Sequence, residues 1–330
     1  MEDMTRDSAP RSIAILLPVF NDWNCLAALI PELSAICSDY VSVDLVVVDD
    51  GSSLPLGREL SSLDAFRNVE IVRLGSNVGH QRAIAVGLCH VANKRAVDAI
   101  VVMDSDGEDS PSQISSLLHQ LHERPDSIIV AQRRKRSEPL PFRLSYRIYR
   151  GTFRLMTGET LDFGNFSAMS LAAATRLSYM TSLWNHFPAT ISRSRLSIVR
   201  VPLDRHHRID GTSRMNSLSL INHGLAAMAA FLDLIFVRLF MIVAVLAGAT
   251  VAVALTAVAI RLFTGAAIPG WATLTIGLAG IALFQLLSLL IVTTFLLLSS
   301  RSTVSPPPSA MAPTYVQSVV QLRDSSERHE

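Results

Sequence analysis

The sequence lacks the signatures of several common protein classes. It contains only three cysteines, which we expect to pack as small hydrophobic residues. His80, His206 and His207 lack the spacing of a zinc site, so we expect them to be solvated or hydrogen-bonded. Neither a G-x-G-x-x-G turn nor a G-x-x-x-x-G-K-S/T loop occurs, which argues against the usual dinucleotide and P-loop sites. A net charge of +1 argues against a basic nucleic-acid-binding protein.

Charge is absent from two long stretches near the C-terminus. No charged residue lies between Arg238 and Arg261, or between Arg261 and Arg301. Each stretch exceeds the roughly 20 residues that a helix needs to cross the hydrocarbon core of a bilayer. A proline and a glycine interrupt the second stretch, which predicts a transmembrane hairpin with helices at about 239–260 and 273–298. The alternative is two buried helices of a soluble core, but soluble helices of this length usually show a polar face.

These features predict a division of the chain into five segments. They are a disordered N-terminus (1–11), a soluble domain (12–215), an amphipathic juxtamembrane helix (216–233), two transmembrane helices (234–300) and a disordered tail (301–330). The polar N-terminus shows no signal peptide, and an even number of crossings returns the chain to its starting side. We therefore expect a multi-pass membrane protein whose soluble domain and both termini are cytoplasmic. The position of Arg261 at the far end of the first helix is a mild objection to this orientation.

Short apolar runs alternate with helical patterns in the soluble part. The runs lie at 13–17, 45–48, 69–74, 99–103 and 128–131. This alternation predicts an α/β fold with a mostly parallel, Rossmann-like sheet and helices on both faces. Acids, amides, glycine and arginine follow the runs. Ligands bind outside the carboxyl ends of strands in open α/β sheets, so we expect the functional site there.

Two carboxylates with one residue between them follow the fourth apolar run. Alternation along an extended strand end points Asp104 and Asp106 to the same side. Hard cations take carboxylate oxygens and share their coordination sphere with substrate phosphates. The pair therefore predicts a divalent metal that holds a diphosphate, although acidic pairs in turns are common and usually solvated.

The order of the motifs resembles that of inverting glycosyltransferases with the GT-A fold, of the family 2 type. Residues 18–22 resemble P-V-Y-N-E, residues 48–52 are V-D-D-G-S, residues 77–79 begin the N-x-G segment and residues 104–106 match D-x-D. Phe20 and Asp22 stand where Tyr and Glu are usual. The chain resembles most the dolichol-phosphate mannose synthases and the bactoprenol (polyprenyl-phosphate) glucosyltransferases. The reasons are the D-S-D-G-E-D run at 104–109, the R-x-x-G-x-S-R run at 208–214 and the C-terminal hairpin.

The resemblance implies roles for individual residues. Asp104, Asp106 and Glu108 would hold Mg²⁺ or Mn²⁺, and Asp104, Asp106 and Arg208 would be catalytic. A UDP- or GDP-linked sugar would be bound by residues of the strand ends and of the basic motif: Pro18, Val19, Asn21, Asp22, Asp49, Asp50, Asn77, Arg82, Asp104, Ser213 and Arg214. The acceptor phosphate would be held by Arg133, Arg143 and Arg147. From the residues alone, Asp49 and Asp50 could equally form a strand-ending turn, Asp109 is structural, and Asp162 either lies near the sugar or belongs to a turn.

An arginine stripe runs beside an aromatic stripe after the fifth apolar run. Arg143, Arg147, Arg150 and Arg154 recur at four-three-four spacing, each preceded by an aromatic residue. This pattern predicts a basic amphipathic helix at about 140–156 that lies in the membrane interface, with guanidinium groups reaching phosphates. The alternative is a surface helix whose aromatic face packs on the sheet domain.

Together these features predict a membrane-anchored, metal-dependent, inverting glycosyltransferase that moves a sugar from a nucleotide sugar to a polyprenyl phosphate. A phosphate monoester is already ionised near neutral pH, so no general base is needed. Two alternatives stay open: a processive polysaccharide synthase, although Q-x-x-R-W is missing, and a non-catalytic scaffold that binds sugar nucleotide. The expected partners are the nucleotide sugar, the lipid and the membrane, without nucleic acid, and a homo-oligomer stays open.

Overall fold

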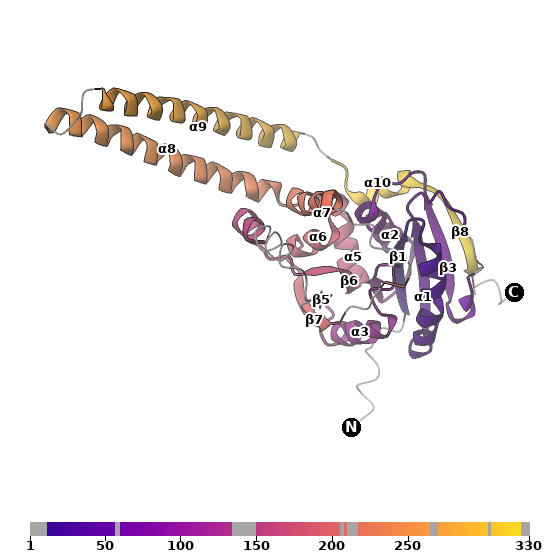
Figure 1. Cartoon of the computed structure of the whole chain (residues 1–330). Coiled ribbons are helices and arrows are strands. Elements are labelled where there is room, and N and C mark those ends of the chain that lie inside the picture. Colours follow the sequence, from indigo (N-terminus) through magenta and orange to yellow (C-terminus); the bar gives the residue numbers. More distant parts are fainter. Residues whose placement is uncertain are drawn as a thin grey trace. The chain divides into compact units, whose positions relative to one another are not determined.

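The computed structural model describes residues 12–56, 60–133, 150–204, 208–209, 217–264, 270–302 and 305–324 (Figure 1). They belong to two compact units. The first, here called the sheet unit, comprises Met1–Arg143, Glu159–Ala230 and Pro306–Glu330. The second, here called the hairpin unit, comprises Leu144–Gly158 and Phe231–Ser305.

The sheet unit is built on an eight-stranded mixed sheet with the order β7-β5-β6-β4-β1-β2-β3-β8. The strands are β1 (Ser12–Val19), β2 (Ser42–Asp49), β3 (Asn68–Leu74), β4 (Ala99–Val102), β5 (Ser127–Arg133), β6 (Phe163–Ser170), β7 (Ser197–Leu203) and β8 (Val316–Asp324). Strands β4, β1, β2 and β3 are parallel, whereas β6 runs antiparallel to β4 and β5, and β8 runs antiparallel to β3. The five apolar runs of the sequence are confirmed as β1 to β5.

Helices cover both faces of the sheet, as the continuous apolar runs require. Successive side chains of β1 point to opposite faces, so Ile13 and Ile15 join one core cluster and Ala14 and Leu16 join the other. The first cluster includes α1 (Trp23–Ile36) and α3 (Ile114–Glu123), and the second includes α2 (His80–Lys94), α5 (Leu171–Ser178) and α6 (Phe187–Arg193). Short 3-10 helices complete the unit: η1 (Cys37–Asp39), η2 (Leu63–Ala65), η3 (Pro111–Gln113) and η4 (Thr181–Trp184).

The three cysteines are buried in this core and form no disulfide. Burial raises the pKa of the Cys37 and Cys89 thiols to about 12, which keeps them protonated and inert. The expectation that they pack as small hydrophobic residues is confirmed.

The segment after the hairpin returns to the sheet unit. The prediction of a disordered tail is wrong for α10 (Pro308–Tyr315) and β8, which pairs with β3 through contacts such as Val320 with Ile71. Of the three prolines that suggested disorder, two precede a helix and the third, Pro308, is its first residue, where a missing N–H costs nothing. Ala312 is buried against the α2 side of the core.

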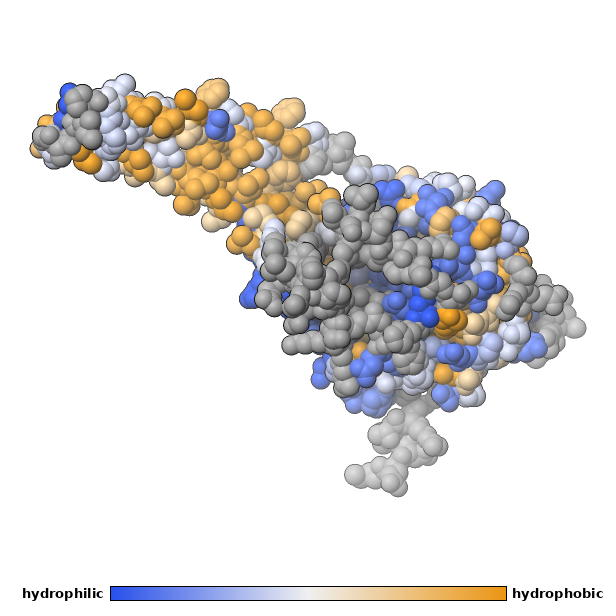
Figure 2. Space-filling model, in the orientation of Figure 1, coloured by the Kyte–Doolittle hydropathy of each residue, from blue (hydrophilic) through white to orange (hydrophobic). Residues whose placement is uncertain are grey.

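The hairpin unit contains α8 (Leu232–Phe263), α9 (Trp271–Ser302) and a short helix at residues 150–157. Both long helices are apolar enough to cross a membrane, and their most apolar windows are 6% and 0% buried. Figure 2 shows hydrophobic residues over much of their outer surface. The predicted pair of apolar helices is confirmed, with each helix several residues longer than expected. The helix expected at 216–233 ends earlier, as α7 (Ser217–Ala229), and α8 begins at Leu232.

Candidate functional site

The loops after β1, β2 and β4 are joined by hydrogen bonds at the carboxyl edge of the sheet. Ser105 donates its hydroxyl to the carbonyl of Pro18 at 2.8 Å, and the Asp50 N–H donates to the carbonyl of Val19, also at 2.8 Å. The predicted residues of the first, second and fourth strand ends are therefore held together.

Asn21 ties the first loop to the second. It has a positive φ of 56°, a conformation that asparagine tolerates better than most residues. Its N–H donates to Ser52 Oγ at 2.9 Å, and its Oδ1 accepts the N–H of Leu54 at 2.9 Å. Asn21 was predicted to contact the nucleotide sugar, and in the structure its side chain orders the loop that follows β2.

Asp49 and Asp50 also organise loops. Asp49 Oδ1 accepts the N–H of Ser52 at 2.9 Å, which is the strand-ending turn that the sequence left open. The carboxylate of Asp50 accepts the N–H groups of Val78 and Gly79 at 2.7 and 3.0 Å, which fixes the N-x-G segment before α2. Burial raises the pKa of Asp50, although these two N–H groups and nearby His80 act in the opposite direction.

Gly51 allows these loops to approach. It has a φ of +69°, and a Cβ at this position would lie 2.6 Å from the backbone nitrogen of Asn77. Only glycine fits both the conformation and the contact.

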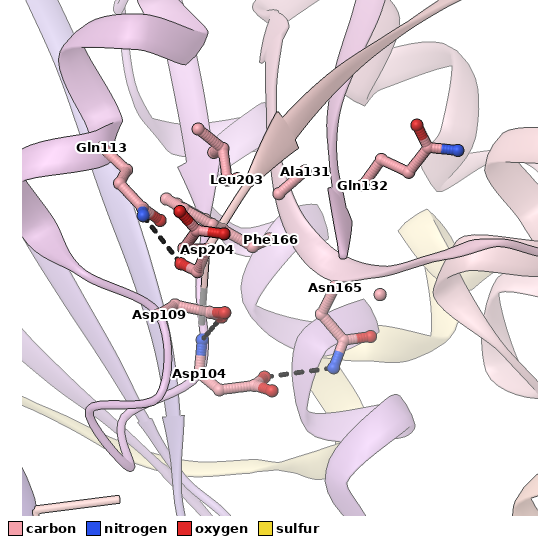
Figure 3. A pocket seen from close by; sticks show the side chains of 10 residues that line it. Asp104, Asp109, Gln113, Ala131, Gln132, Asn165, Phe166, Leu203 and Asp204 are labelled. Carbon is pink, nitrogen blue, oxygen red and sulfur yellow. Dashed lines mark hydrogen bonds between the residues drawn. The ribbon is translucent and has the colours of Figure 1, made fainter. Parts of the chain in front are cut away.

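Asp104 is held by two side chains, Asn165 of β6, which Figure 3 shows, and His80 of α2. Asn165 donates from Nδ2 to Asp104 Oδ1 at 3.0 Å, and His80 Nε2 lies 3.1 Å from the same oxygen. Gln81 in turn donates to Asn165 Oδ1 at 3.1 Å and accepts the N–H of Phe187 at 2.7 Å. A chain of hydrogen bonds thus runs from the first turn of α6 to Asp104.

The acidic surroundings change the pKa of His80. Partial burial lowers this pKa, but the charges of Asp104, Asp106 and Asp50 and the hydrogen bond with Asp104 outweigh that effect and raise it. The expectation that His80 is hydrogen-bonded is confirmed.

Arg208 bridges the loops that follow β1 and β4. Its Nη2 donates to Asp22 Oδ2 at 2.6 Å, and its Nη1 lies 3.4 Å from Asp106 Oδ2. The next residue, Ile209, donates its N–H to the carbonyl of Asp106 at 3.1 Å. Gly107 has a φ of +79°, and a side chain there would overlap Ile209. Three predicted site residues, Asp22, Asp106 and Arg208, are brought together.

The carboxylates of this site fit a divalent cation, because carboxylate oxygens suit Mg²⁺ or Mn²⁺. Asp104 Oδ1 accepts from Asn165, while Asp106 pairs with Arg208 and accepts the N–H of Glu108 at 3.0 Å. Among the residues that the structure describes, no group of three or more His, Cys, Asp or Glu is placed as a metal site. Asp109 Oδ2 accepts the N–H of Asp104 at 3.4 Å, in agreement with a structural role.

The other predicted residues fall into two groups. Asn77 and Arg82 are exposed. Asp162, for which the sequence left two interpretations open, accepts from Gln132 at 2.7 Å and from Arg200 at 3.0 Å. Ser213, Arg214, Arg143, Arg147 and the side chain of Arg133 lie outside the described part of the chain.

Sequence reasoning missed Gln81 and Asn165. Asn165 also lines a small pocket with Asp104, Asp109, Gln132 and Asp204, and Gln113 closes one side by donating to the carbonyl of Asp204 at 2.7 Å (Figure 3). Asn165 belongs to the D-F-G-N-F segment at residues 162–166, in which the sequence analysis considered only Asp162 as a candidate site residue.

Comparison with known proteins decides the family. The model of glycosyl transferase family 2 matches residues 14–180, about half of the chain. The protein belongs to glycosyl transferase family 2. The match covers the strand ends described above, from β1 to the end of β6, and the chain is a glycosyltransferase.

Similar curated proteins cover more of the chain. The sequence is 26% identical over 230 residues to an undecaprenyl-phosphate 4-deoxy-4-formamido-L-arabinose transferase of Enterobacter, and 26% identical over 225 residues to that of Salmonella paratyphi A. The matches cover 66% of this chain and 67% and 66% of those proteins, so the chain spans about two thirds of their length.

Solved structures show the same fold. The glucosyl-3-phosphoglycerate synthase of Mycobacterium tuberculosis, in complex with Mn²⁺, UDP-glucose and phosphoglyceric acid, aligns with a TM-score of 0.51 at 17% identity. The alignment covers 68% of this chain and 80% of that one. Together with the family, this confirms the GT-A fold.

Proposed function

We propose that this protein transfers a sugar from a nucleoside-diphosphate donor to a polyprenyl phosphate in the membrane, with inversion at the anomeric carbon. The observation that carries the proposal is that one chain joins a family 2 site to two exposed apolar helices, each long enough to cross a bilayer. The names of the similar curated proteins support a polyprenyl phosphate as the acceptor.

The transfer is a displacement at carbon. An oxygen of the acceptor phosphate attacks the anomeric carbon from the side opposite the diphosphate, and the bond between that carbon and the diphosphate oxygen breaks. The electron pair of this bond leaves with the nucleoside diphosphate. The acceptor phosphate is ionised before the reaction, so no side chain has to remove a proton.

The residues of the site assist the departure of the diphosphate. Arg208, whose pKa is raised by Asp22 and Asp106 against the effect of partial burial, stays charged and can turn toward the developing negative charge. Asp104, Asp106 and Glu108 would hold a divalent cation, which when bound neutralises charge on the diphosphate. Asp50 and Asn21 would contribute to binding rather than to bond breaking, because they order the loops that would receive the nucleotide.

The order of the elements along the chain supports a catalytic domain that lies entirely on one side of the membrane. Residues on both sides of the hairpin, α7 before it and α10 with β8 after it, belong to the sheet unit. A folded unit cannot lie on two sides of a bilayer, so α8 and α9 would cross it as a pair and return. With the basic stretches near the soluble domain, this favours a cytoplasmic sheet unit.

A labelled-donor panel tests the proposal. Purified full-length protein in detergent is incubated with UDP- and GDP-linked sugars, Mg²⁺ or Mn²⁺, and a polyprenyl phosphate, and the label is followed into the lipid phase. We expect one donor to give a lipid-linked product that requires the phosphate of the acceptor. The matching polyprenol, which lacks the phosphate, is the control. No lipid product from any donor, or equal transfer to the polyprenol, would contradict the proposal.

A further inference from the structure

The carboxylate of Asp106 is in contact with a cation of the protein itself. Arg208 Nη1 lies 3.4 Å from Asp106 Oδ2, and the N–H of Glu108 donates to Asp106 Oδ1 at 3.0 Å. Both oxygens of a candidate metal ligand therefore have a partner within the protein. The side chains of Arg208 and Asp106 are 16% and 19% exposed, so solvent screens the interaction of their charges only in part.

The backbone of Arg208 is fixed beside the loop that follows β4. The N–H of the next residue, Ile209, donates to the carbonyl of Asp106 at 3.1 Å. A Cβ on Gly107 would overlap the side chain of Ile209, which shows how closely the two segments approach. These contacts keep Arg208 near Asp106 whichever partner its guanidinium takes. A change of partner therefore needs rotation of the Arg208 side chain alone.

The two acids that share this guanidinium hold it unequally. Arg208 Nη2 lies 2.6 Å from Asp22 Oδ2, whereas the contact with Asp106 is 3.4 Å long. Hydrogen bonds between a charged N–H group and a carboxylate are usually about 2.7–2.9 Å long, so Asp22 is the closer partner and Asp106 the weaker one. Arg208 can thus release Asp106 while it keeps Asp22.

A divalent cation on Asp106 would lie close to the same guanidinium. Hard cations of this kind bind carboxylate oxygens at about 2.0–2.2 Å, and Arg208 Nη1 lies 3.4 Å from Asp106 Oδ2. The two positive charges would then be only a few ångströms apart. Because the pair is largely shielded from solvent, their repulsion is stronger than it would be in water. Arg208 in this position therefore opposes binding of the cation.

We propose that Arg208 competes with the divalent cation for Asp106, and that a nucleoside diphosphate relieves this competition. The part played by the nucleoside diphosphate rests on the proposed function. Its phosphate oxygens offer the guanidinium an anionic partner that arginine binds with two parallel hydrogen bonds. Arg208 then releases Asp106, which becomes available to the cation. The site thereby binds the cation weakly when alone and more tightly together with the nucleotide.

Binding of Mn²⁺ alone is the first test. The full-length protein in detergent is freed of metal with EDTA and dialysed, and the Mn²⁺ that stays unbound is measured by electron paramagnetic resonance. We expect Arg208→Gln to bind Mn²⁺ about tenfold more tightly than the wild type, because a positive charge beside the ion is gone. Arg200→Gln is the matched control, since Arg200 Nε lies 3.0 Å from Asp162 Oδ1. It also removes an arginine from an aspartate, and it should leave the Mn²⁺ affinity unchanged.

Addition of UDP or GDP in excess separates competition from a general effect of charge. Nucleotide should increase the Mn²⁺ affinity of the wild type by a larger factor than that of Arg208→Gln, because only the wild type has a guanidinium that can change its partner. An equal factor for the two proteins would mean that Arg208 stays at Asp106 when nucleotide binds, which would overturn the inference.

Melting temperatures show whether the variants keep the fold. Arg208→Lys is the second variant, and it decides the test if Arg208→Gln unfolds. Its ammonium group contacts both acids poorly, so its Mn²⁺ affinity should lie between those of the wild type and Arg208→Gln. No gain in Mn²⁺ affinity in either variant would overturn the inference, whatever the transfer assay gives. A wild type that transfers no sugar to polyprenyl phosphate, together with the expected gain, would remove the proposed function and leave the competition at Asp106 in place.

Discussion

Arg208 donates to Asp22 Oδ2 at 2.6 Å, which joins the loop after β1 to a residue that lies 186 positions later in the sequence. The same guanidinium reaches Asp106, and the Arg208 side chain is 16% exposed. Two carboxylates share one cation, so the bridge holds the loops after β1 and β4 at a fixed separation. A planar guanidinium can contact both acids at once, which an ammonium group does poorly.

The first prediction concerns this bridge. We expect Arg208→Lys to lower the rate of sugar transfer by about 10²-fold, the scale lost with one electrostatic contact in a transition state. The melting temperature should fall only slightly. Arg176→Lys, at an exposed position of α5, is the control. Full activity of Arg208→Lys would mean that simultaneous contact of a planar guanidinium with both acids is not required.

The second prediction concerns Asp106. Asp106→Asn should keep the fold and lower transfer by about 10²-fold or more, and EDTA should abolish the activity of the wild type. Metal-dependent binding of the nucleoside diphosphate, measured by calorimetry, should weaken in parallel. The exposed Asp126 provides the control variant Asp126→Asn. An active mutant together with harmless EDTA would remove the proposed role of the metal.

A third prediction addresses the hydrogen-bond chain to Asp104. Gln81→Ala removes the side-chain donor to Asn165 Oδ1 and the side-chain acceptor of the Phe187 N–H. Because Asp104 would then be oriented less well, we expect kcat to fall about tenfold, the scale of a lost hydrogen bond in a preorganised site. Gln120→Ala on α3, whose partner is Glu123, should have no effect on kcat. Equal rates for the two variants would show that Asp104 needs no support from α6.

The fourth prediction is a pH dependence of stability. Glu70 accepts from His90 at 2.8 Å and from Arg95 at 2.7 Å, and these bonds lower its pKa although burial acts in the opposite direction. A carboxyl group whose pKa is lowered by folding stabilises the protein above its unfolded pKa, and this stability disappears as the pH falls through the folded pKa. Glu70→Gln should therefore cost about 3 kcal/mol at neutral pH and progressively less in acid, because it breaks a buried charge pair.

Denaturant unfolding of the wild type and Glu70→Gln between neutral and acidic pH measures this difference. Glu123→Gln, at an exposed helix position, should show no comparable pH dependence. A constant difference between the wild type and Glu70→Gln at all pH values would contradict the assignment.

The fifth prediction concerns the segment after the hairpin. A chain that ends after Ser302 loses α10 and β8 and leaves β3 as an unprotected edge strand. We expect such a chain to aggregate and to lose nucleotide binding, whereas removal of residues 325–330 alone should be harmless. Size-exclusion chromatography and nucleotide binding measure both outcomes. A monomeric, nucleotide-binding protein without β8 would show that the strand is dispensable.

Much of the fold could be predicted from the sequence, because β1 to β5 are buried on both faces and therefore appear as continuous apolar runs. Strand β6 could not, since its F-G-N-F-S-A-M-S sequence contains small and polar residues and resembles a loop. Strand β8 could not be predicted for a different reason. It follows three prolines, and its partner β3 lies more than two hundred residues earlier.

The site was predictable to the extent that its residues follow apolar runs. Asp22, Asp104 and Asp106 are such residues, and the structure places them in one region. Asn165 contacts Asp104 because β6 pairs antiparallel with β4. This pairing cannot be recognised from the local sequence. The roles of Asn21 and Asp50 as loop supports also depend on partners far along the chain.

The pairing of β8 with β3 has a consequence for biosynthesis. The edge of β3 is made early, but its partner strand is synthesised only after both apolar helices. The sheet therefore stays incomplete until the hairpin has been synthesised. Complete folding of the glycosyltransferase domain is thereby delayed until the membrane segment is available for insertion, which would limit the time that a finished enzyme spends away from the bilayer.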